Sequence, residues 1–186
     1  MTSEGRAARA ERRLPLLAWD TPLYCHVPVD HDFEPSALTE GADGSDRWSG
    51  PGQPTAYLAS DAGVAMAEMA RHHPPSGTRV ERRVMRLEPR PRALQGLVDL
   101  RDPAVLRALR APVAPSAFLD ADTARVVADR VRVDPRHVGL IVPSMAFLDR
   151  PDRPNIVLFG ERLGANGVGE VLAGWQEVAR VAVGGP

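Results

Sequence analysis

The chain has 186 residues, of which 44% are hydrophobic and 25% charged, and its net charge is −1. Such a composition is ordinary for one globular domain with a proper core. The charge excludes the basic footprint of a protein that binds nucleic acid or an anionic membrane directly. Cys25 is the single cysteine, which excludes an intrachain disulfide framework and favours a reducing compartment. No apolar run approaches the length of a membrane span, so we expect a cytoplasmic protein.

The first third of the chain predicts an arm, two strands and a long loop. Residues 1–13 are rich in arginine, alanine and glutamate, and we expect a flexible arm there, ahead of a domain over residues 14–186. Leu23–Val29 and Thr55–Ala59 have the β-branched and aromatic composition of strands. The acidic, polar stretch Asp30–Gly44 between them predicts a loop.

A helix is predicted from Ser60 to about His73. Ser60 is a good N-cap residue, and the negative charge of Asp61 in the first turn suits the helix dipole. Pro74 and Pro75 follow, and proline cannot continue a helix. The helix carries Glu68, which the candidate site below includes.

The second half predicts alternating strands and helices. The elements expected are strands over Val80–Leu87 and Leu94–Leu100, helices over Asp102–Arg110 and from Asp120 or Asp122 to Arg132, buried strands over Val138–Val142 and Asn155–Phe159, and an edge strand over Trp175–Val183. This mixed order favours an α+β fold over a doubly wound sheet. We expect a single domain with a mixed central β-sheet and flanking helices.

Glu68 is the first candidate for chemistry. It is the only ionisable residue between Ala62 and Ala70, so a helix that is apolar nearly all round has a good chance of burying it. A buried carboxylate needs a partner, and Arg47 is the natural one. The alternative is that Glu68 marks the solvent face, which spacing alone favours because charges are usually exposed.

Three further residues have both a structural and a functional interpretation. Arg47 precedes Trp48 and the turn Gly50-Pro51-Gly52; it is either a surface arginine or a bidentate phosphate ligand. Tyr57 is either a core residue or a ring that stacks on a nucleotide base. Ser144 is either a turn serine or a hydroxyl that positions phosphate or ribose.

The ordered set of these residues resembles the RES domain family, which is named for its arginine, glutamate and serine. In that family an arginine, an aromatic residue and a glycine-rich turn precede a strand tyrosine, and an alanine-rich helix supplies the glutamate. Arg47, Tyr57 and Glu68 match in order, and Pro143-Ser144 followed by Asn155–Phe159 matches the late motif. The family usually has an arginine at the end of its first strand, whereas this chain reads Leu23-Tyr24-Cys25-His26-Val27 there. Either His26 replaces the arginine or a ligand contact is missing.

The resemblance implies an ADP-ribosyltransferase-like fold and an activity that breaks the nicotinamide–ribose bond of NAD. The acceptor would be inorganic phosphate, water or a protein side chain. Arg47, Tyr57, Glu68 and Ser144 would be catalytic. Substrate-binding roles would fall to further residues of the same segments, namely Tyr24, His26, Trp48 and Asn155.

The resemblance also implies partners. NAD would be a substrate, so no cofactor is expected, and no metal is needed: His26, His31, Asp30 and Asp32 lack a strong ligand spacing. Many RES proteins are toxins of bacterial toxin–antitoxin pairs, so we expect an antitoxin protein as a partner. A homodimer is also compatible with the sequence. Because the first strand lacks the arginine that is usual in the family, a second hypothesis is retained. In it, the chain is a catalytically inactive binding module with the same fold.

Overall fold

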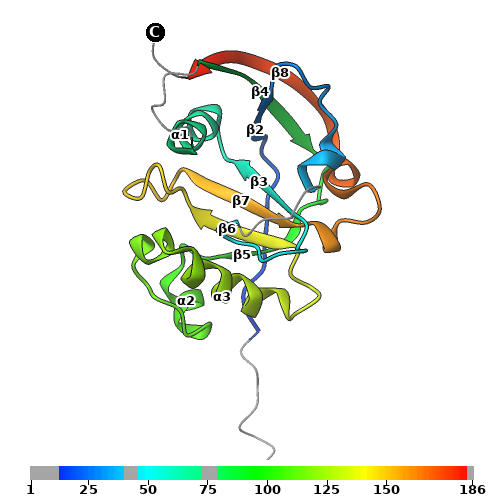
Figure 1. Ribbon diagram of the computed structural model, residues 1–186. Coiled ribbons are helices and arrows are strands. Elements are labelled where there is room, and N and C mark those ends of the chain that lie inside the picture. The colour runs from blue at the N-terminus through cyan, green and yellow to red at the C-terminus, as the bar shows by residue number, and fades with distance from the viewer. Residues whose placement is uncertain (1–12, 40–45, 73–78, 184–186) are drawn as a thin grey trace, which may run out of the picture.

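The computed structural model describes residues 13–39, 46–72 and 79–183, and it shows the predicted single α+β domain (Figure 1). The strands are β1 (Leu17–Ala18), β2 (Leu23–Pro28), β3 (Thr55–Ala59), β4 (Val80–Pro89), β5 (Gln95–Asp99), β6 (Gly139–Pro143), β7 (Pro154–Phe159) and β8 (Leu172–Val183). The α-helices are α1 (Ala62–His72), α2 (Pro103–Ala108) and α3 (Ala121–Arg132). Short 3₁₀ helices are η2 (Pro35–Thr39), η3 (Pro115–Leu119), η4 (Gly160–Arg162) and η5 (Gly167–Val171).

The eight strands form one mixed sheet in the order β1-β5-β6-β7-β3-β2-β4-β8. Only β5 and β6 run parallel; every other neighbouring pair is antiparallel. The strand pairing between β2 and β3 is limited to a single residue pair, Tyr24 with Ala59. The rest of β2 pairs with β4 alone and the rest of β3 with β7 alone. The two halves of the sheet therefore diverge from this one point.

Both faces of the central strands are covered, which explains their continuous apolar sequences. Along β7, Ile156 and Leu158 pack into one core cluster, whereas Val157 and Phe159 pack into the other. The second cluster includes the buried apolar residues of α2 and α3, which lie below β5 and β6 in Figure 1. α1 lies between the diverging halves, where Val64 and Ala65 pack against Ala59.

The predicted elements are observed with small shifts. The N-cap of α1 is Asp61 rather than Ser60, because the Asp61 carboxylate accepts the backbone N–H of Val64 at 3.0 Å. The predicted loop Asp30–Gly44 contains η2 in its described part, and β8 pairs with β4 alone, as predicted for an edge strand. The arm expected over residues 1–13 lies, apart from Arg13, outside the described residues. In the described part of the chain, no helix is long and apolar enough to span a membrane.

Candidate active site

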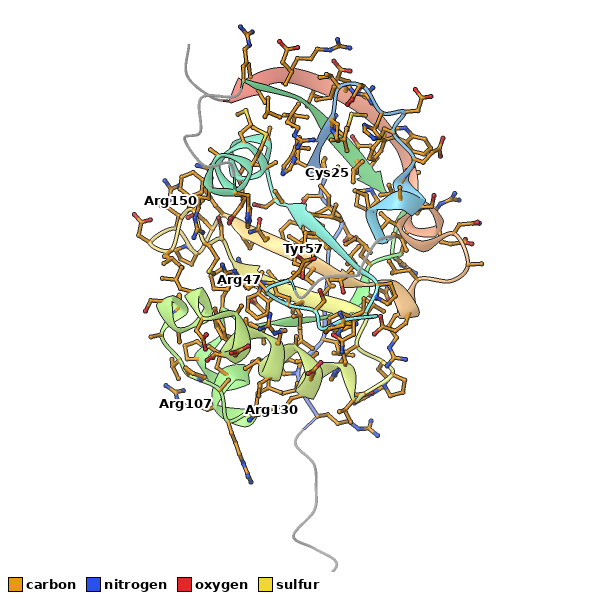
Figure 2. All side chains as sticks on the ribbon, viewed as in Figure 1. Cys25, Arg47, Tyr57, Arg107, Arg130 and Arg150 are labelled. Carbon is orange, nitrogen blue, oxygen red and sulfur yellow. The ribbon has the colours of Figure 1, made fainter. Side chains whose placement is uncertain are left out.

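A cavity of about 680 Å³ opens where the two halves of the sheet diverge. Tyr24, Cys25 and His26 of β2 line one wall, and Tyr57 to Ala59 of β3 line another. The remaining lining comes from α1, the start of α3, η2, the loop before β3, β7, the end of β6 and Met145 just after it. In Figure 2, Cys25, Tyr57 and Arg47 follow one another from the β2 side of the molecule toward α3. A cavity of this size suits a small-molecule ligand.

Glu68 extends from α1 into this cavity with one carboxylate oxygen held by three donors. Its Oε1 accepts hydrogen bonds from Ser144 Oγ at 2.6 Å, from Asn155 Nδ2 at 2.9 Å and from the backbone N–H of Ala146 at 3.2 Å. The other oxygen, Oε2, lies 3.6 Å from Arg71 Nη1, and the side chain is 17% exposed. The fold therefore fixes the carboxylate through Oε1 and leaves Oε2 for a ligand.

Ser144 and Asn155 contribute to the site through Glu68. Ser144 ends up fully buried just after β6, and it is not among the cavity-lining side chains, whereas Asn155 lines the cavity from β7. Hydrogen bonds from two neutral donors to one carboxylate oxygen hold its orientation and stabilise its charge. The contact that the sequence predicted between Ser144 and phosphate or ribose would require this buried hydroxyl to reach past Glu68.

Arg47 lies in the same cavity, but its hydrogen bonds differ from the predicted pairing with Glu68. Its Nη1 donates to the carbonyl oxygens of Phe118 at 2.6 Å and Leu119 at 2.7 Å. Burial is the largest cause that lowers the Arg47 pKa, followed by the charge of Arg71, and the charge of Glu68 partly opposes both. The prediction of a direct Arg47–Glu68 pair is therefore wrong, because the carbonyls at the end of η3 are the nearer acceptors.

Tyr57 and Trp48 hold the loop that carries Arg47. The Tyr57 hydroxyl accepts the backbone N–H of Trp48 at 3.2 Å and lies 3.0 Å from Ser49 Oγ. Burial raises the Tyr57 pKa, so the phenol stays neutral at physiological pH. The Trp48 ring packs against Phe118 with centroids 5.1 Å apart and is 2% exposed. Trp48 thus contributes mainly packing on this side of the cavity.

On the opposite wall, Tyr24 and His26 line the cavity from β2. Cys25 is buried between them, and burial raises the pKa of its thiol to about 12, so the thiol stays protonated at neutral pH. His31 contacts the exposed carboxylate of Asp30 at 3.0 Å rather than joining His26. Within the described residues, histidine, cysteine and acidic side chains do not gather into a group of three that could hold a metal.

A clasp at the start of α1, formed by Asp61 and Arg153, was not predicted from the sequence. Arg153 donates to both Asp61 carboxylate oxygens, at 2.6 and 3.1 Å, and its guanidinium lies 4.4 Å from the centre of the Phe147 ring. Arg153 holds the Asp61 pKa below its ordinary value. The clasp ties the helix that carries Glu68 to the β6–β7 connection, close to the three donors of Glu68 Oε1.

Arg71 and His72, near the site, were not predicted from the sequence either. They follow Glu68 by three and four residues, the spacings that place side chains on one helix face. Arg71 contacts Glu68, and His72 lines the cavity. This spacing is the sequence signal that could have placed Arg71 and His72 near Glu68. The signal is weak by itself, because His72 lies close to the prolines that were expected to end the helix.

Comparisons with known proteins agree with this architecture. Residues 17–173 match the family model of the RES domain, whereas no curated protein matches the sequence. In structure, the chain is similar to one in the crystal structure of the M. tuberculosis MbcT–MbcA toxin–antitoxin complex, with a TM-score of 0.60 and 17% identity. The alignment covers 91% of this chain and 87% of that one. Because the family match spans most of the sequence, this chain belongs to the RES domain family.

Proposed function

We propose that this protein is an enzyme that consumes NAD by breaking the bond between nicotinamide and ribose. The observation that carries the proposal is the Glu68 carboxylate, fixed through Oε1 and presenting Oε2 to a cavity shared with Arg47. Cleavage of a glycosidic bond develops positive charge on the sugar. A carboxylate already oriented in a half-buried site stabilises such charge without reorganising during the reaction.

The other groups of the cavity suit the remainder of NAD. Arg47 offers the Nε and Nη2 donors of its guanidinium to the phosphates, because Nη1 is anchored to the carbonyls of Phe118 and Leu119. Tyr57 presents an aromatic ring beside the ribose that Glu68 would contact. NAD enters as substrate, and the acceptor is inorganic phosphate or water. A fold that resembles that of ADP-ribosyltransferases is part of the same proposal.

We also propose that the protein acts as the toxin of a bacterial toxin–antitoxin pair. The family membership and the fold shared with a chain of the MbcT–MbcA complex support this role. The partner would be an antitoxin protein that restrains the enzyme. Induced expression should then arrest growth and lower cellular NAD, and Glu68→Gln should remove both effects. Growth arrest that persists with Glu68→Gln would contradict the proposed origin of toxicity.

The test of the enzymatic proposal is proton NMR of the purified protein with NAD, with and without inorganic phosphate. Glu68→Gln keeps the side-chain shape but removes the charge, and we expect nicotinamide release to fall by about 10²–10³. Glu81→Gln, at an exposed carboxylate paired with Arg79, is the matched control and should release nicotinamide like the wild type.

The products distinguish the alternatives. Release that requires phosphate indicates phosphorolysis, and release without it indicates hydrolysis. Adenine-labelled NAD whose label stays on a protein indicates protein ADP-ribosylation instead. If NAD binds, as seen by a thermal shift, and no nicotinamide appears under any condition, the enzymatic proposal fails in favour of a binding module.

A further inference from the structure

Arg71 places a second guanidinium beside Glu68, which lines the cavity. It lies in the last turn of α1, three residues after Glu68, and its side chain is 37% exposed. Its Nη1 is 3.6 Å from Glu68 Oε2, a distance that gives electrostatic attraction but no good hydrogen bond. Within the described residues this is its one ion pair, and one such contact engages only a small part of the five N–H donors of an arginine.

Arg47 supplies the first guanidinium, and its orientation is fixed from behind. Two carbonyl oxygens hold Nη1, while Nε and Nη2 have no hydrogen-bond partner among residues 13–39, 46–72 and 79–183. Both cations lie around Glu68, because Arg71 Nη1 is 3.6 Å from its Oε2 and Arg47 lines the same cavity as Glu68. The charge of Arg71 accordingly contributes to lowering the pKa of Arg47. Two like charges at one cavity are unfavourable unless an anion joins them.

We infer that Arg71 and Arg47 together bind the diphosphate of a nucleotide, with Glu68 Oε2 facing the adjoining ribose. A diphosphate spreads several oxygens and more than one negative charge along its length, which two planar guanidinium forks match better than one. This inference rests on the proposed function and names the groups that hold its substrate.

The arrangement lets Arg71 engage a ligand at little cost to the site. Leaving Glu68 breaks only the 3.6 Å contact, and the carboxylate keeps its three donors on Oε1. An ion pair between residues three apart on a partly exposed helix face contributes little to stability. Removing the Arg71 charge should therefore leave both the fold and the orientation of Glu68 intact, so Arg71→Gln reports on ligand binding.

The test is calorimetric binding of ADP-ribose and of adenosine to the wild type and to Arg71→Gln. We expect the variant to bind ADP-ribose about tenfold more weakly, a change of about 1.4 kcal/mol, and with a smaller dependence on salt. Adenosine, which lacks phosphate, should bind both proteins equally. Arg71→Lys keeps the charge without the fork and should recover part of the loss. Arg79→Gln, at an exposed arginine paired with Glu81, is the matched control.

The outcomes separate this inference from the proposed function. Equal binding of ADP-ribose to wild type and Arg71→Gln overturns the inference, and so does an equal loss for ADP-ribose and adenosine, which would reveal a purely structural role. Because the ligand is not turned over, ADP-ribose binding that depends on Arg71 in a protein that releases no nicotinamide would sustain the inference while the enzymatic proposal fails. Failure of the wild type to bind ADP-ribose overturns the inference.

Discussion

Ser144→Ala tests whether the buried serine acts by orienting Glu68. The substitution removes the 2.6 Å hydrogen bond to Glu68 Oε1 and the 3.2 Å contact between Ser144 Oγ and the Ala146 N–H. Glu68 would retain the amide of Asn155 and the backbone N–H of Ala146. The carboxylate would therefore remain bound, but less firmly fixed.

The magnitude follows from the character of the lost bond. A hydrogen bond to a charged group contributes about 1.5–3 kcal/mol. Two donors remain and the Glu68 side chain is 17% exposed, so we expect the lower end, about 1.5 kcal/mol, in the free energy of unfolding. If the same orientation serves the transition state, nicotinamide release should slow by about tenfold.

The assays are urea unfolding and steady-state nicotinamide release at varied NAD and phosphate. We expect kcat to fall while the KM for phosphate stays constant, because the Ser144 hydroxyl is fully buried. Ser60→Ala is the matched control, since the buried Ser60 hydroxyl has no partner in the described part of the chain. A raised KM for phosphate with unchanged stability would refute this reasoning and restore a direct contact between Ser144 and the acceptor.

Three other predictions concern the frame around the site. The Cys25 thiol, with its raised pKa of about 12 and 5% exposure, should resist iodoacetamide in the native protein and react only after unfolding; rapid native labelling would contradict the structure. Because Arg153 lowers the Asp61 pKa below its ordinary 3.8, that pair stabilises the protein above about pH 4 and its contribution is lost as the pH falls further, so Asp61→Asn should flatten the acid limb of a stability–pH curve. Arg132 is 8% exposed, forms an ion pair with Glu161 and lies 3.8 Å from the centre of the Phe159 ring. Arg132→Met should lower the free energy of unfolding in urea by about 2 kcal/mol, less than the roughly 3–5 kcal/mol lost when a fully buried pair is broken. An unchanged urea midpoint would contradict a stabilising role of this ion pair.

Several elements were predictable because their signals are local. The strand Thr55–Ala59 and the helix start at Asp102 follow from composition and spacing alone, and the structure shows Asp102 accepting the N–H of Ala104. For α3 the sequence left Asp120 and Asp122 as alternative caps, and the structure selects Asp120, which accepts the N–H of Thr123. The α1 cap was misplaced by one residue. Ser60 and Asp61 are both good caps, and the bidentate contact with Arg153, 92 residues away, selects Asp61.

The sequence by itself determined the α+β class, the order of the elements and the set of residues from which a site would be built, because periodicity and caps act over a few neighbouring residues. Only the tertiary structure decided how those residues meet. The divergence of β2 from β3 after a single residue pair opens the cavity. Arg47 donates its hydrogen bonds to the carbonyls of Phe118 and Leu119, which are distant in sequence, instead of pairing with Glu68 as predicted. Which hydrogen bonds form depends on which donors and acceptors folding brings within about 3 Å of each other. The local sequence around a residue does not contain that information.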